Sequence, residues 1–241
     1  MAKCSSSAMI HGGRRRNLNE FCGAYGHNLT FAEMKWLADW CLVRGVNLLV
    51  PHAFYYSVRG PRRDERPPDV GPNSPWWADF KRFADYCRWL CWLNTDSRHV
   101  CEIAILCESN QLPWRTAKIL QQNQLDFHYL ERGATGAGNY KLVISEDLSD
   151  TELLAAVART VPADLQVSPP QPDLRYRHVV KDGTDYYLLF NEGSQTISFR
   201  WLVAVQGTTA LLDPSRQQQT PVTSAEPLTL PPHELRVLQI D

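Results

Sequence analysis

The feature that most constrains the fold is a capped helix that leads directly into a short apolar strand. Thr30 and Glu33 form a capping box, in which each side chain satisfies a backbone amide at the start of a helix. Apolar side chains recur at helical spacing through residues 31–44, and Gly45 supplies the stop. The apolar run 46–50 follows at once and is typical of a parallel strand covered on both faces. The segment therefore predicts an α-then-β unit.

A long loop and a second helix are expected after this strand. The loop, residues 55–73, is rich in arginine, acidic residues and proline. The helix is predicted to begin near Ser74 and Pro75 and to continue to about Leu93. Loops of this length are usually functional or disordered, and α/β enzymes place substrate contacts in loops that follow the carboxyl ends of parallel strands.

The rest of the chain shows two further patterns. A strand, a helix, a strand and a candidate third strand of a doubly wound βαβ fragment are predicted over 100–107, 113–122, 125–130 and 141–144. From residue 174 the pattern becomes antiparallel, with a hairpin that turns at 181–183 and several short strands after it. These strands predict a small β-sandwich, so the expected fold class is α/β plus β.

Composition excludes several classes of protein. With 44% hydrophobic residues and a net charge of −1, the chain is not expected to be disordered or to bind nucleic acid as its main partner. No apolar run reaches the ~18 residues that cross a bilayer, so no membrane partner is expected. The N-terminus lacks the apolar core of a secretory signal, and the seven cysteines show no C-x-x-C spacing. We expect reduced, buried thiols and a cytoplasmic protein.

No metal or cofactor is expected from the motifs. The cysteines and histidines show no zinc-ligand spacing, and His11 and His27 are lone imidazoles near glycine turns. The glycine-rich stretch 133–138 follows a strand but opens no clear helix. A flexible loop is therefore favoured there over a dinucleotide site, which leaves nucleotide binding as a weak alternative.

Glu20 is the acidic residue that stands out. If residues 5–10 or 16–20 form a strand, Glu20 lies at the carboxyl end of that part of the chain, where barrel enzymes place catalytic groups. A carboxylate there suits a glycosidase, which uses two acidic side chains. A surface glutamate or a salt bridge between a helix and a loop is the alternative, and the residues alone leave both open.

Aromatic residues lie near the same predicted edge. His52, Tyr55 and Tyr56 follow the strand 46–50 directly, and their polar-edged rings suit a ligand rich in hydroxyl groups. Trp76 and Trp77 open the next helix, where stacking on a sugar and packing in the core are both compatible with the pattern.

Longer motifs resemble the end of large bacterial glycoside hydrolase barrels. They are E-x-x-G-A-Y-G at residues 20–26, K-W-L-x-D-W at 35–40, and R-G-V-N-x-x-x-P-H-A-F-Y-Y-S at 44–57. These motifs are similar to those of family 2 and family 42 β-galactosidase relatives and of large α-L-rhamnosidase-like hydrolases. The segment C-E-I-A-I-L-C-E-S resembles the flavodoxin-like domain that follows such barrels, and L-R-Y-R-H-V-V-K-D-G resembles their C-terminal β-sandwich.

The resemblance implies three parts and a set of site residues. Residues 1–98 are expected to end a (β/α) TIM barrel, 99–173 to form a shortened flavodoxin-like segment with a linker, and 174–241 to form the sandwich. Glu20 matches the expected nucleophile at the end of the penultimate barrel strand. The sugar-binding residues implied are His52, Tyr55, Tyr56, Trp76, Trp77 and His27, the last standing where a tryptophan is common.

The chain also departs from the family pattern. Only about two barrel strands can be placed in residues 1–98, whereas a closed barrel needs eight. The acid/base carboxylate of an earlier strand has no counterpart. The middle domain also looks shortened, because residues 145–147 run almost directly into 148–160, where an intact member would carry many more residues. We therefore predict a glycoside hydrolase fragment that acts on O-glycosidic bonds with impaired activity, unless a complementing barrel chain or a homo-oligomer completes it. The alternative is a noncatalytic carbohydrate-binding or assembly module.

Overall fold

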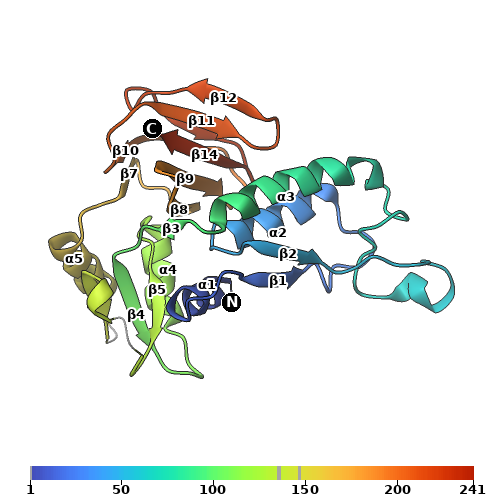
Figure 1. Cartoon of the computed structure of the whole chain (residues 1–241), viewed down its shortest axis with the longest axis horizontal. Helices are drawn as coiled ribbons and strands as arrows, with labels where there is room; N and C mark the ends of the chain where they lie inside the picture. The colour runs from blue at the N-terminus through green and yellow to red at the C-terminus, as the bar shows by residue number, and fades with distance from the viewer. Residues whose placement is uncertain (1, 135–136, 146–147) are drawn as a thin grey trace.

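The computed structural model describes residues 2–134, 137–145 and 148–241. Its first part contains two parallel strands and the helices around them (Figure 1). Strands β1 and β2 pair in register from Leu18 opposite Leu48 to Phe21 opposite Pro51. The elements in chain order are α1 (Ala2–His11), β1 (Leu18–Phe21), α2 (Phe31–Leu42), β2 (Leu48–Pro51), the short 3₁₀ helices η1 (Gly60–Asp64) and η2 (Trp77–Asp79), and α3 (Phe80–Asn94).

The middle part is a small parallel sheet with helices beside it. Its strand order is β5-β4-β6, so the strand–helix–strand order predicted from the sequence is present as a parallel βαβ unit. The elements are β4 (Ile103–Cys107), α4 (Trp114–Gln122), β5 (His128–Glu131), η3 (Ala137–Asn139), β6 (Leu142–Ile144) and α5 (Asp150–Thr160). Thr135, Gly136, Glu146 and Asp147, which belong to segments singled out in the sequence, lie outside the described residues.

The C-terminal part consists of two antiparallel sheets. One has the order β12-β11-β14-β9-β8-β3 and the other β13-β10-β7. The predicted hairpin is confirmed, since Asp182 and Gly183 turn with φ of 52° and 90° between its strands. The strands are β3 (Arg98–His99), β7 (Leu165–Ser168), β8 (Leu174–Lys181), β9 (Thr184–Asn191), β10 (Ile197–Val203), β11 (Thr209–Asp213), β12 (Gln218–Pro221), β13 (Leu228–Leu230) and β14 (Leu235–Ile240).

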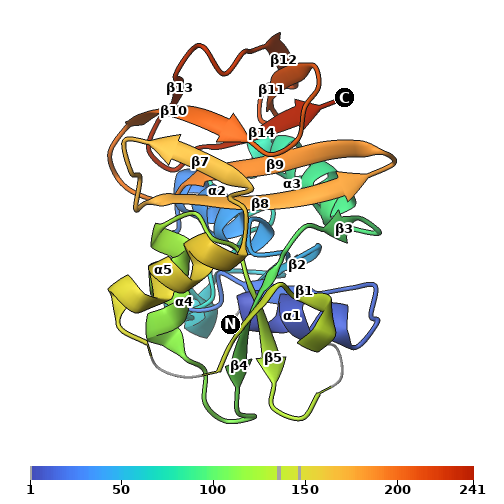
Figure 2. The same cartoon turned by 90° about the vertical axis from the view of Figure 1, so that its left-hand side faces the viewer.

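The six-stranded sheet is the central layer, because each of its faces builds a separate core. Leu188 and Val237 face α2 and α3, where they pack with Met34 and Leu90. The neighbouring residues along each strand, such as Leu189, point to the opposite face and pack against the three-stranded sheet. Figure 2 shows this layering, with the helices behind the sheet and β7, β10 and β13 on its other side. Within the described residues the chain is thus mixed helix and sheet with several sheets and no closed barrel.

Several expected element boundaries were wrong for identifiable reasons. Residues 5–10 are helical, and the strand that contains Glu20 starts at Leu18. The strand predicted at 46–50 starts at Leu48, because Val46 still bonds back to the end of α2. The helix predicted from Ser74 starts at Phe80, after a turn and η2. None of the described helices combines the length and apolar character needed to cross a bilayer.

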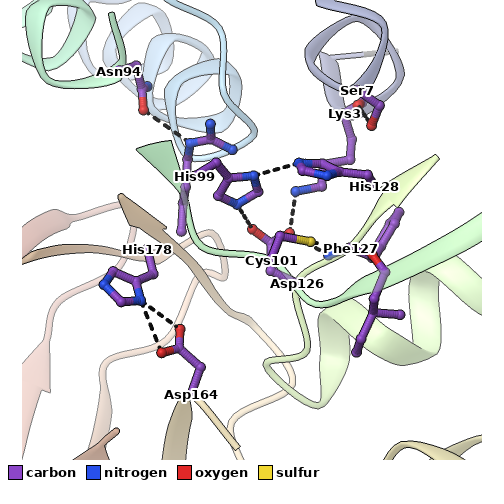
Figure 3. Close-up of polar contacts among 12 residues, drawn as sticks. Lys3, Ser7, Asn94, His99, Cys101, Asp126, Phe127, His128, Asp164 and His178 are labelled. Atoms are coloured by element: carbon purple, nitrogen blue, oxygen red, sulfur yellow. Dashed lines mark hydrogen bonds and ion pairs between the residues drawn. The ribbon is translucent and has the colours of Figure 1, made fainter. Parts of the chain in front are cut away.

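A buried chain of polar side chains joins the three parts (Figure 3). His99 of β3 bonds through Nε2 to Asp126, at 2.6 Å, and through Nδ1 to Nε2 of His128, at 2.6 Å. Nδ1 of His128 meets the hydroxyl of Tyr140 at 2.8 Å, and that oxygen meets Nε2 of His11 at 2.6 Å. One donor direction satisfies every contact. His11, His128 and His99 each donate from Nε2, and His128 and His99 accept at Nδ1, until the hydrogen-bond chain ends on the Asp126 carboxylate.

Two positively charged side chains lie near Asp126, where this hydrogen-bond chain ends. Lys3 of α1 forms an ion pair with Asp126, and the buried Arg177 of β8 donates to Asn94 at 3.1 Å. Although burial opposes it, the charge of Lys3 and the contact with His99 hold the pKa of Asp126 well below its usual value. Burial lowers the pKa of His99 to about 3 and also lowers that of His128. Both rings are therefore neutral in the folded protein at neutral pH.

Truncation of Leu90 tests the helix–sheet core. Leu90 is fully buried on α3, so Leu90→Ala is expected to lower the free energy of unfolding by about 2–5 kcal/mol. Leu202→Ala, at a leucine that is 56% exposed, is the matched control and should change it by less than about 0.5 kcal/mol. Urea unfolding followed by circular dichroism measures both; equal effects would contradict the layering described above.

The histidine chain predicts an acid-sensitive fold. Because the folded pKa of His99 lies below the unfolded value of about 6.5, the unfolded chain binds the proton first as the pH falls. The stabilisation is complete above about pH 6.5 and is lost toward pH 3. Between pH 6.5 and 5 the free energy of unfolding should fall by about 2 kcal/mol for each such histidine. Urea titrations across this range measure the slope.

His99→Gln should reduce the fall in the free energy of unfolding between pH 6.5 and 5. His233→Gln, at an exposed position, should leave that fall unchanged. An unchanged slope in His99→Gln would show that the buried imidazole does not control the acid response.

Candidate active site at the carboxyl ends of β1 and β2

Glu20 and His52 meet at the carboxyl edge of the two parallel strands. Glu20 is the third residue of β1, and His52 directly follows β2. The backbone amide of His52 donates to the carbonyl of Phe21 at 3.0 Å, which extends the pairing by one residue. Nδ1 of His52 hydrogen bonds with a carboxylate oxygen of Glu20, and both side chains are open to solvent. The structure thus brings together the predicted nucleophile and one predicted sugar-binding residue.

The local sequence fixes this edge. The predicted capping box is present, with Thr30 accepting from the amide of Glu33 at 3.2 Å, and it sets where α2 begins. Gly45 has a φ of 93° and ends the helix in the left-handed conformation that favours glycine. This short connection returns the chain parallel to β1, so the two strands end at the same edge. One exposed carboxylate with an adjacent imidazole can bind a polar group or attack an electrophilic carbon, provided that other groups complete the site.

His27 joins the loops that follow β1 and β2. Its Nδ1 accepts from the amide of Asp69 at 3.2 Å, and its Nε2 donates to the carbonyl of Arg62 at 3.1 Å. Both ring nitrogens therefore bond to backbone, and the edge of the ring packs on Tyr55. His27 shapes the rim of the edge from the side of the long loop.

Asp69 is the residue at this edge that sequence reasoning missed. Its buried carboxylate accepts from the amides of Tyr55 (3.2 Å), Gly71 (2.8 Å) and Asn73 (3.0 Å). The bond to Gly71, two residues on, is an Asx turn. An aspartate two positions before a glycine was the available sequence signal. The carboxylate organises the loop rather than facing Glu20.

The remaining predicted site residues are dispersed. The hydroxyl of Tyr55 donates to the carbonyl of Pro67 at 3.2 Å, while Tyr56 is fully exposed. Trp76 donates from Nε1 to the carbonyl of Leu29 at 3.1 Å and packs against the helix–sheet core. Trp77 stacks on Phe80 with ring centroids 5.0 Å apart and is partly exposed.

The described residues contain one group of potential metal ligands, outside this edge. His99, Cys101 and His128 each offer one ligand atom, and these three atoms lie within 4.8 Å of one another. Both imidazoles are already hydrogen bonded, and Lys3 and Arg177 place positive charge beside them. These charges oppose a divalent cation, so the donor set fits the buried hydrogen-bond chain better than a metal centre.

No family model and no curated protein matches the chain, but solved structures do. A rhamnosidase from Novosphingobium sp. PP1Y has a TM-score of 0.71 at 12% identity, over 99% of this chain and 32% of that protein. A β-galactosidase from Bacillus circulans sp. alkalophilus has a TM-score of 0.62 at 9% identity, over 98% and 58%. A GH42 β-galactosidase from G. stearothermophilus has a TM-score of 0.61 at 8% identity, over 90% and 52%.

The chain therefore spans between about a third and three fifths of the length of these structures. At such identities the likeness concerns the fold alone. The described chain has a fold like that of parts of glycoside hydrolases, without a specific family being shown.

Proposed function

We propose that this chain is part of a glycoside hydrolase, in which residues 1–98 form the end of a β/α barrel. Residues 99–173 would form a shortened flavodoxin-like segment, and residues 174–241 a C-terminal β-sandwich. The observation that carries the proposal is Glu20 beside His52, at the carboxyl edge of two parallel strands, in a fold like that of glycoside hydrolases. The substrate would be a carbohydrate with an O-glycosidic bond.

The uncovered face of β1 and β2 supports the barrel part of the proposal. Leu18, Leu48 and Val50 are 54%, 39% and 38% exposed, although parallel sheets are normally covered on both faces. In addition, a cavity of about 610 Å³ opens between β2 and α3, lined by apolar side chains such as Leu49 and Phe83. Both features are expected where further β/α units pack. Those units would come from the same polypeptide or from a complementing chain.

In the completed site, Glu20 acts as the nucleophile of a two-carboxylate mechanism. One of its oxygens accepts the hydrogen bond of His52, which leaves the other free to attack the anomeric carbon. The glycosidic C–O bond breaks as a glycosyl ester forms, and a second carboxylic acid protonates the departing oxygen. Water then hydrolyses the ester, with the second group acting as base. With Glu20 as the nucleophile, the second carboxyl group should lie about 5–5.5 Å from the carboxyl group of Glu20 in the completed site.

The catalytic role of the Glu20 carboxylate is tested in the protein completed by the missing barrel strands. The chain is produced together with the polypeptide that supplies the preceding strands, and assayed on aryl α-L-rhamnosides and aryl β-D-galactosides. Glu20→Gln should lower kcat by about 10³-fold or more, because the amide cannot form the ester. Glu65→Gln, at an exposed glutamate of the adjacent loop, is the matched control and should retain activity. The chain alone should show no hydrolysis above background.

Equal activity of Glu20→Gln and the completed wild type would remove Glu20 from the mechanism. If the completed wild type hydrolyses no aryl glycoside but binds sugar, and Glu20→Gln still binds it, the noncatalytic carbohydrate-binding module is the better description.

A further inference from the structure

A second pocket lies where the C-terminal half of α3 meets the six-stranded sheet, and it shares Arg88 and Trp92 with the cavity between β2 and α3. It has a volume of about 720 Å³, within the range of about 300–1,000 Å³ typical of small-molecule sites. Helix α3 contributes Trp89 and Trp92, and the sheet contributes Tyr186, Gln219 and Gln239. We call this the aromatic–amide pocket.

The sheet residues of the aromatic–amide pocket share one face. Tyr186 of β9 pairs with Gln239 of β14, and Gln219 of β12 pairs with Leu212 of β11. Tyr186 and Leu212 belong to the core on the helix side of the sheet, so the two amides point to that side as well. Their positions are set by strand register and not by a mobile loop.

Trp92 provides aromatic surface that the core does not use, beside Trp89, which packs against the helix–sheet core. Trp92 is 47% exposed, and its ring centroid lies 6.4 Å from that of Trp89. The ammonium of Lys181 lies 4.6 Å from the Trp92 centroid while it donates to the carbonyl of Thr95 at 2.7 Å. This buried cation fixes the ring, so little side-chain freedom is lost when a ligand stacks on it.

The charged groups of the pocket are already paired. Asp85 lies 3.1 Å from Arg88, and Asp213 lies 3.0 Å from Arg236. Gln239 donates from Nε2 to the carboxylate of Asp241 at 2.7 Å. The remaining recognition groups are the amide of Gln219, the side-chain carbonyl oxygen of Gln239 and the aromatic faces, which offer both donors and acceptors and carry no charge. A neutral ligand with many hydroxyl groups and flat C–H faces matches this chemistry, because the hydroxyls bond to amides and the C–H faces stack on the indoles.

We propose that the aromatic–amide pocket binds a neutral oligosaccharide at a site separate from Glu20. This inference goes beyond the hydrolase proposal and does not require that Glu20 carries any chemistry.

Calorimetric titration of the full chain with saccharides tests the inference. Cellobiose, lactose and maltose are the neutral probes, and digalacturonic acid is the acidic one. At least one neutral disaccharide should bind saturably at millimolar concentration, and the acidic one about tenfold more weakly or not at all. Trp92→Ala should weaken the neutral interaction about tenfold, since it removes the stacking face.

The matched controls use residues of the same types outside the pocket. Trp114→Ala, at a tryptophan that is 71% exposed on α4, should leave the affinity unchanged. Gln219→Ala changes an exposed edge strand without touching the core and should weaken binding, whereas Gln166→Ala on β7 should not. Circular dichroism confirms that each variant is folded.

Absence of saturable binding by all three neutral probes would overturn the inference, as would equal affinities of Trp92→Ala and Trp114→Ala. Loss of binding in Glu20→Gln with retention in Trp92→Ala would place the saccharide at Glu20 instead. Binding that survives Glu20→Gln supports the separate site, whatever the outcome of the hydrolysis assay.

Discussion

Parallel strands are stable when both of their faces are covered by other elements. In the pair formed by β1 and β2, only one face is covered by residues that the structure describes. Helices α2 and α3 pack on one face and connect it to the core shared with the six-stranded sheet. The opposite face leaves Leu18 and Val50 open to solvent. The same two strands carry Glu20 and His52 at their carboxyl ends, so the proposed site and the uncovered face lie on one element. In the proposed function, activity at Glu20 depends on what covers that face.

The second organising contact is buried and polar. His128, His99 and Asp126 form a directed hydrogen-bond chain. Lys3 of the first helix forms an ion pair with the carboxylate of Asp126. Removal of one member would leave a buried partner unsatisfied, a loss that costs more than the bond itself contributes. The hydrogen-bond chain connects the first helix and the small parallel sheet to β3. The hydrogen bond between Arg177 and Asn94 extends this contact to α3. These buried contacts therefore connect the three parts of the fold.

Local signals in the sequence predicted the elements whose boundaries are set locally. The capping box placed the start of α2, and the Lys-Asp-Gly turn placed the β8–β9 hairpin. Strand β12 and helix α1 were missed, because polar residues such as Gln218 and Ser7 carry no apolar period and their structure depends on tertiary contacts. The sequence placed Glu20 and His52 near strand ends, but their contact depends on the register between two strands. The histidine chain joins residues far apart in sequence, so no motif spacing revealed it.

Hydrogen–deuterium exchange with mass spectrometry tests most directly whether β1 and β2 are an open end of a barrel. In the chain alone, amides of residues 18–21 and 48–50 should exchange much faster than those of β9 and β14, which lie inside a sheet covered on both faces. Addition of the polypeptide that supplies the preceding strands should slow exchange at 18–21 and 48–50 and leave β9 unchanged. Protection of β1 and β2 equal to that of β9 in the chain alone, with no change on addition, would contradict the account.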